Sequence, residues 1–102
     1  MMNNSKILGH IGLAARARKL TSGEDQVLDS IRSKRAKIVF LASDAGINTT
    51  KRITDKCAYY QIMLINDLSS DDITKAIGKE NRKVIAIIDQ QFAQMIKSEI
   101  EI

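Results

Sequence analysis

The sequence predicts an α/β protein: a three-layer α/β/α sandwich around a small mixed sheet of four strands. The first observation is a set of three short, unbroken apolar runs at residues 38–42, 62–65 and 84–88, which are typical of strands buried on both faces. The second is that apolar residues at helical spacing lie before, between and after these runs. With a weaker strand at residues 20–22, helices and strands alternate along the chain, beginning and ending with a helix.

Each helix is predicted from apolar residues that recur three or four positions apart. These positions are Ile7, Leu8, Ile11, Ala14 and Ala15; Val27, Leu28 and Ile31; Ile53 and Cys57; Ile73, Ala76 and Ile77; and Phe92, Met95, Ile96 and Ile100. We expect Ser22 to cap the second helix and Asn48 the third. Ser69, with Asp72 three residues later, resembles a capping box for the fourth.

A chain of 102 residues is long enough for one domain with a core, and we expect residues 1–102 to form it. No apolar run approaches the ~20 residues that a membrane span needs, so we expect no membrane partner. The start, MMNNSK, lacks the basic and then apolar pattern of an export signal. The lone Cys57 cannot form an internal disulfide. We therefore expect a cytoplasmic protein.

Positive charge is concentrated in the first part of the chain, although the formal net charge is only +4. Residues 1–60 hold eleven Lys and Arg against five Asp and Glu, whereas residues 61–102 hold five against seven. This imbalance favours an anionic partner. Each basic cluster alone also fits a solvated face, and loops that meet at one edge of the sheet would bring several clusters onto one surface.

The most informative stretch for function is GLAARARKLTSGEDQ, residues 12–26, in which a basic helical end runs into a turn opened by glycine. Cations there can hold phosphates while polar side chains read base edges. The residues concerned are Arg16, Arg18 and Lys19, and then Gly23, Glu24, Asp25 and Gln26. Acidic residues in a first helical turn also complement the helix dipole, so a purely structural role for Glu24 and Asp25 stays open.

Residues that could carry catalysis all have simpler interpretations. Asp44 follows a predicted strand, where turn chemistry is the commoner use of a Ser-Asp pair. His10 has no partner at metal-ligand spacing, and Cys57 shares an apolar helical face. Gly9 and Gly12 lie within a helix and form no phosphate loop. We therefore expect no catalytic residue, metal or cofactor, with a small hydrolase that uses Asp44 or Cys57 as the weakest alternative.

Three segments in order, GLAARARKLTSGEDQVLDSI, KIVFLASDAGINTTKRITDKC and ITKAIGKENRKVIAIID, resemble the kink-turn-binding ribosomal proteins, and among them the small bacterial YlxQ-type members. The resemblance runs from about Ile7 to Ile88. It implies a three-layer α/β/α fold that binds sharply bent RNA. It also implies contact through a G-x-N-E turn, which opens the second helix and in the family meets tandem G·A pairs.

The chain departs from this turn in two positions. Gly23 is kept, Asp25 replaces the Asn, and Gln26 replaces the Glu, as it does in bacterial relatives. Asp25 keeps an acceptor but loses the amide donor of Asn. The lysine that the family often carries three residues beyond the turn is Asp29 here, which removes a phosphate contact.

A second matching segment is the late loop, residues 78–83. Lys79 and Asn81 stand where the archaeal proteins carry apolar residues against a protruding nucleotide, so this loop is expected to hold RNA backbone. The resemblance and the basic positions together assign RNA contacts to Arg18, Lys19, Gly23, Glu24, Asp25, Gln26, Lys37, Lys79, Glu80 and Arg82.

These inferences predict a non-catalytic, monomeric RNA-binding protein of ribosomal-protein type. Its expected partner is a kink-turn or a similarly bent structured RNA, ribosomal or otherwise, and the ribosome is a candidate partner. The alternative is a protein-interaction module on the same fold that docks an acidic partner.

Overall fold

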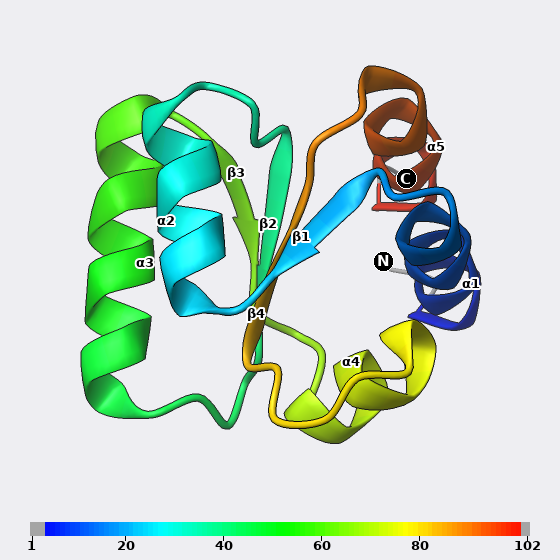
Figure 1. Ribbon diagram of the computed structural model, residues 1–102, viewed down its shortest axis with the longest axis horizontal. Helices are drawn as coiled ribbons and strands as arrows, with labels where there is room; N and C mark the ends of the chain where they lie inside the picture. Colours follow the sequence, from blue (N-terminus) through cyan, green and yellow to red (C-terminus); the bar gives the residue numbers. More distant parts are fainter. Residues whose placement is uncertain (1–3, 101–102) are drawn as a thin grey trace.

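One mixed sheet with strand order β1-β4-β2-β3 forms the centre of the molecule, and helices cover both of its faces (Figure 1). The computed structural model describes residues 4–100, so residues 1–3 of MMNNSK and residues 101–102 lie outside it. Helices and strands alternate in the predicted order. They are α1 (Asn4–Arg16), β1 (Leu20–Ser22), α2 (Glu24–Arg32), β2 (Ile38–Leu41), α3 (Ile47–Tyr60), β3 (Met63–Ile65), α4 (Ser70–Ile77), β4 (Val84–Ile87) and α5 (Gln90–Ile100).

The layers match the predicted α/β/α sandwich. Helices α2 and α3 lie on one side of the sheet, and α1, α4 and α5 lie on the other (Figure 1). β2 and β3 are parallel, whereas β4 runs antiparallel to both β1 and β2. The sheet is therefore mixed, as predicted, and the last strand of the chain occupies a central position.

Alternation along the two central strands divides the buried residues into two cores, one on each face of the sheet. On β2, Phe40 faces α1, α4 and α5, while Val39 faces α2 and α3. On β4, Ile85 and Ala86 divide in the same way. All four side chains are fully buried. The unbroken apolar runs arise because both faces of these strands are covered by helices.

The apolar run at residues 62–65 departs from the prediction of burial on both faces. Its strand, β3, lies at an edge of the sheet, where Met63 is 41% exposed and only Ile65 is buried. An apolar run does not distinguish an edge strand from a central one, and this expectation was wrong for β3.

Two of the three predicted helix caps are also wrong. Gly23 and Gly46 occupy the N-cap positions of α2 and α3, and neither helix has a side-chain cap. Ser22 instead ends β1, and Asn48 lies within α3. The cap of α4 is confirmed, since the Asp72 amide donates to Ser69 Oγ over 3.1 Å.

Across residues 4–100, no helix is both long and apolar enough to cross a membrane.

Candidate nucleic-acid interface

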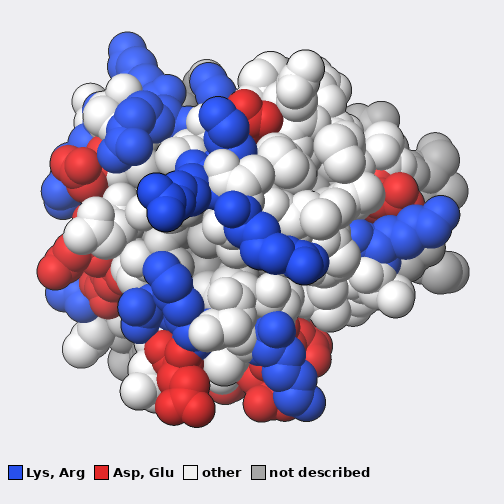
Figure 2. Space-filling view, turned by 45° about the vertical axis from the view of Figure 1, so that its right-hand side comes forward, with Lys and Arg blue, Asp and Glu red and all other residues white. Residues whose placement is uncertain are grey.

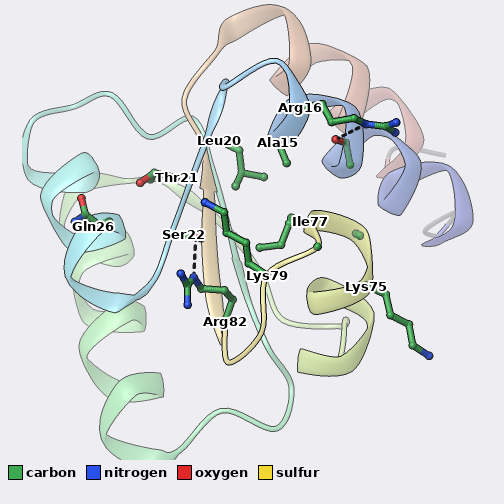
Figure 3. A pocket seen from close by; sticks show the side chains of 13 residues that line it. Ala15, Arg16, Leu20, Thr21, Ser22, Gln26, Lys75, Ile77, Lys79 and Arg82 are labelled. Atoms are coloured by element: carbon green, nitrogen blue, oxygen red, sulfur yellow. Dashed lines mark hydrogen bonds between the residues drawn. The ribbon is translucent and has the colours of Figure 1, made fainter.

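A hollow of about 660 Å³ opens beside the β1 edge of the sheet, between α1, α4, the late loop and the start of α2 (Figure 3). Its lining comes from segments far apart in the sequence, which the fold brings together. The residues are Gly12, Ala15, Arg16, Leu20, Thr21, Ser22, Gln26, Lys75, Ala76, Ile77, Gly78, Lys79 and Arg82.

The hollow has an apolar interior, and Lys and Arg side chains lie around it. Leu20 and Ile77 lie near its middle, and Lys79 extends across it towards β1 (Figure 3). Arg16 and Lys75 lie on its far side, on α1 and α4 (Figure 3). Four cations and one neutral amide around an apolar floor suit a ligand that has both phosphates and bases.

Gly23 determines how the chain enters α2. Its φ of +95° and ψ of +149° fall in a region that L side chains rarely adopt. Its amide donates to the carbonyl of Val84 over 3.0 Å, which ties the turn to the start of β4. Because no side chain caps α2, its first amides point outward at the positive end of the helix. This geometry presents N–H donors to an anion or to a base oxygen.

Glu24 is held by α3 and does not line the hollow. Thr49 Oγ1 donates to Glu24 Oε1 over 2.7 Å, and Arg52 forms an ion pair with the same carboxylate. The Thr49 hydroxyl, together with the Arg52 guanidinium, lowers the pKa of the Glu24 carboxyl. Glu24 therefore fixes α2 against α3, whereas Gln26, two residues later, is exposed and lines the hollow.

Arg82 connects the late loop to β1. Its Nε donates to Ser22 Oγ over 3.1 Å, and its Nη1 donates to the Glu80 carbonyl over 3.0 Å. The Glu80 side chain lines a separate, smaller hollow of about 220 Å³ beside Ser70 and Lys83. Arg82 thus positions the loop against the entry to α2 and also contributes positive charge.

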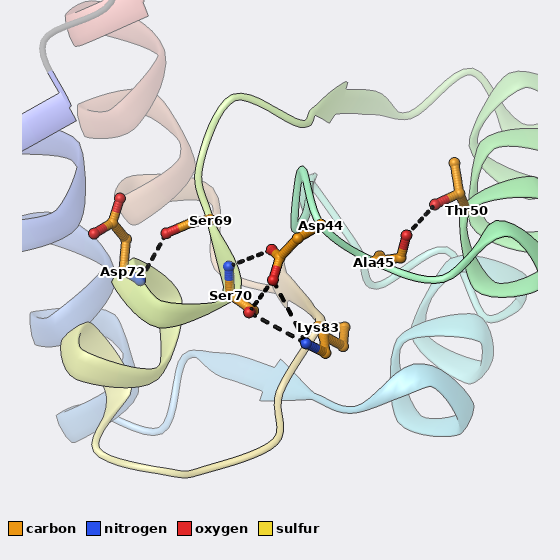
Figure 4. A network of polar contacts seen from close by, with 7 residues as sticks. All are labelled: Asp44, Ala45, Thr50, Ser69, Ser70, Asp72 and Lys83. Carbon is orange, nitrogen blue, oxygen red and sulfur yellow. Dashed lines mark hydrogen bonds and ion pairs between the residues drawn. The ribbon is translucent and has the colours of Figure 1, made fainter.

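Besides the Arg82 contacts, a second set of polar contacts, around Asp44, holds the other side of the late loop (Figure 4). Asp44 accepts from the Ser70 amide over 2.8 Å and from the Ser70 hydroxyl, and Lys83 Nζ lies 3.6 Å from its carboxylate. The Ser70 side-chain and backbone hydrogen bonds lower the pKa of Asp44 to about 2, and Lys83 adds to this effect. Asp44 lies in the turn after β2, as predicted, but its carboxylate bonds mainly outside this turn, to the start of α4 and to the late loop.

The structure brings only part of the predicted site together. Gln26, Lys79 and Arg82 line one hollow, and Gly23 opens the adjacent turn. Asp25 is exposed but does not line the hollow. Among the cations of the hollow, Arg16 belongs to the basic run that the sequence singled out for phosphates, whereas Lys75 was not assigned from sequence. A signal for Lys75 was present, because it lies four residues before Lys79 in the same matching segment.

Three predicted cations lie elsewhere. Arg18 and Lys19 are exposed in the turn before β1. At ~3.3 Å per strand residue, Lys19 is about 13 Å from Gly23, so it would meet a different phosphate. Lys37 lies before β2 and lines a hollow beside β3, the opposite edge of the sheet. Figure 2 shows Lys and Arg side chains gathered over the middle and upper left of one face, with most acidic side chains at its lower and left margins.

Residues weighed for catalysis occupy structural positions. Cys57 lies on the buried face of α3, and desolvation raises the pKa of its thiol to about 11. His10 Nε2 lies 3.8 Å from Glu99 Oε2, across the contact between α1 and α5. Within the described part of the chain, no group of three or more His, Cys, Asp or Glu side chains is placed to hold a metal ion.

The family model described as the ribosomal protein L7Ae/L30e/S12e/Gadd45 family matches residues 5–97. The chain belongs to this family. Membership confirms the resemblance read from the sequence, and it accounts for the order of helices and strands around the hollow.

Two curated relatives within the L7Ae/L30e/S12e/Gadd45 family are similar over most of their length. Each is named RNA-binding protein YlxQ. The Bacillus subtilis protein is 49% identical over 86% of this chain and 88% of its own. The Enterococcus faecium protein is 46% identical over 97% of this chain and 95% of its own.

Solved structures agree on the fold. A Bacillus halodurans protein of unknown function has a TM-score of 0.87 and 41% identity, covering 93% of this chain and 96% of its own. The Giardia lamblia 15.5 kD RNA-binding protein has a TM-score of 0.82 and only 16% identity, covering 98% of this chain and 90% of its own. The second likeness therefore concerns the fold alone.

Proposed function

We propose that this protein binds structured RNA and recognises a kink-turn or a similarly bent element at the β1-edge hollow. The observation that carries the proposal is that Gln26, in the first turn of the uncapped helix α2, meets Lys79 and Arg82 around one hollow. Membership of the L7Ae/L30e/S12e/Gadd45 family and the names of its two YlxQ relatives support RNA as the ligand.

The geometry suggests a division of roles. Gln26 carries a carbonyl acceptor and an amide donor, so it can read a base edge. Arg16, Lys75 and Lys79 can contact phosphates on either side, and such contacts position RNA without reading its sequence. A bent RNA presents both kinds of group to one concave surface, whereas a straight duplex offers mainly its backbone. We therefore propose recognition by shape combined with base contacts at the α2 turn.

We further propose that the protein is not an enzyme. Asp44, the carboxylate placed after β2, is occupied by Ser70 and Lys83, and its low pKa makes it a poor proton acceptor. The Cys57 thiol is buried with a raised pKa, which opposes formation of the nucleophilic thiolate. Both side chains contribute to the fold.

The test is a titration of the protein with a kink-turn RNA and with a straight duplex of equal length at near-physiological salt. Gln26→Ala should weaken binding of the kinked RNA by about 1–3 kcal/mol and leave duplex binding unchanged. Gln94→Ala, at an exposed position on α5, is the matched control. Equal and strongly salt-dependent binding of both RNAs by the unaltered protein would contradict kink recognition, because phosphate attraction alone binds both.

A further inference from the structure

A second basic surface lies beside β3, at the opposite edge of the sheet from the β1-edge hollow. It surrounds a hollow of about 620 Å³, to which Lys34, Lys37 and Lys97 contribute. The three lysines come from the loop after α2, the position before β2, and α5. Only the folded chain brings them together, so their proximity is not a local charge run.

Within residues 4–100, no side chain neutralises the charge on this surface. Among residues 4–100, no acidic residue lines the hollow, and none of the three lysine ammonium groups forms an ion pair or hydrogen bond. By contrast, Lys51, Lys75 and Lys83 each have a carboxylate partner. Three lysines without a partner in the described part of the chain surround one concavity and create a local positive potential that favours an anionic ligand.

The backbone next to these lysines is available for pairing. β3 is an edge strand that pairs with β2 on one side only, so its other side presents N–H and C=O groups outward. Met63, the first residue of β3, lines the hollow and is 41% exposed. An extended peptide can add to such an edge, with backbone hydrogen bonds for affinity and a flexible methionine for apolar contact.

These features favour one occupant over two others. A second copy of the chain would place its own Lys34, Lys37 and Lys97 beside these lysines, and the like charges would repel. RNA would leave the strand edge unused. The aromatic ring at this hollow, Tyr60, is partly buried against the core and in T-shaped contact with Tyr59, with ring centroids 4.9 Å apart, so it offers only a partly covered ring for base stacking. An acidic protein strand uses both the charge and the edge.

We propose that the β3 edge is a docking site for an acidic, extended protein segment. The segment adds to the sheet beside β3, and its carboxylates pair with Lys34, Lys37 and Lys97. The outermost strands β1 and β3 are separated by two others, about 14 Å at ~4.8 Å per strand. Both edges can therefore be occupied at once, and the protein would link an RNA to an acidic partner. Peptide docking does not depend on RNA binding.

The experiment uses the full chain labelled with ¹⁵N and a short synthetic peptide that alternates Glu and Val. Amide shifts should move at residues 63–65 and around the three lysines, both without RNA and with a kink-turn RNA present. The same peptide with an N-methylated backbone keeps its charge but has no N–H donors, so its binding should be much weaker. Equal binding of the two peptides would overturn strand addition.

Charge reversal supplies the matched variants. The double variant Lys34→Glu, Lys97→Glu should bind the peptide about tenfold more weakly or worse, with an otherwise native spectrum. Lys79→Glu, which reverses a charge in the β1-edge hollow, should leave peptide affinity unchanged. Shifts confined to the β1-edge hollow, or an equal loss in both variants, would overturn the proposal. So would an oligouridine that moves the β3 amides as strongly as the peptide does, since that result would assign the surface to RNA.

Discussion

Replacing Gly23 by alanine isolates the backbone geometry of the α2 turn. Gly23 and Gly46 are both uncapped N-cap positions, and a Cβ atom added to either meets nothing within 4 Å. They differ in backbone conformation, since φ is +95° at Gly23 and −63° at Gly46. Gly46→Ala is therefore a control with the same change in composition, cap position and open space.

The expected difference follows from the strain alone. An L residue forced into the Gly23 conformation costs about 2 kcal/mol. At Gly46, alanine is a weaker N-cap than glycine, which lowers the free energy of unfolding, but it also makes the unfolded chain less flexible, which raises it. The net change in the free energy of unfolding is therefore within about 0.5 kcal/mol. At about 2.1 cal/mol/K per residue, the unfolding entropy of this chain is about 0.2 kcal/mol/K. Gly23→Ala should therefore lower Tm by about 10 °C.

Urea unfolding followed by circular dichroism measures both variants. Because domains of this kind have a free energy of unfolding of about 5–15 kcal/mol, Gly23→Ala should remain folded, and its RNA affinity can be measured as well. We expect that affinity to fall, since Gly23 sets the entry into α2 and thereby the position of Gln26 at the hollow. Equal stability of the Gly23 and Gly46 variants would refute the argument from strain.

Two further predictions concern groups with shifted pKa values. Asp44→Asn should lower the urea midpoint at neutral pH. Because the folded-state pKa of Asp44 is depressed, its contribution to stability is complete above the ordinary pKa of 3.8 and disappears as pH falls through about 2. Midpoints of the two proteins measured from about pH 6 to about pH 2 should therefore converge, and a constant difference would contradict the role of ionised Asp44. Cys57, with its pKa raised from 9.0 to about 11, holds about a hundredfold less thiolate than an ordinary thiol, and it should react with a thiol reagent only as fast as the chain opens. Rapid labelling of the folded protein would contradict its burial.

The sequence was sufficient to predict the fold because local pattern and tertiary burial agree. β2 and β4 have helices on both faces, so their apolar runs are unbroken, and the helices keep one apolar face each. The position of β3 at an edge could not be read in this way, because its residues are as apolar as those of a central strand. Its exposed Met63 becomes visible only when the strand order is known.

The site was predicted in part for the same reason. The α2 turn is local in sequence, so Gly23 and Gln26 were identified correctly as parts of one turn beside a basic segment. The engagement of Glu24 by Thr49 and Arg52 depends on the packing of α3, which no local pattern shows. Lys37 was assigned to the candidate site by the resemblance and its basic charge, whereas the sheet order puts it at the other edge.

The central position of β4 has a consequence for how the chain folds during synthesis. β4 is the last strand to be made, yet it pairs with both β1 and β2 and contributes side chains to both cores. The pairing of Leu20 with Ile87 closes a loop that includes most of the chain, and such long-range contacts slow folding. Until residues 84–87 leave the ribosome, β1 has no strand to pair with and neither core is closed. Native structure should therefore form late and cooperatively, and fragments that end before β4 should remain unfolded.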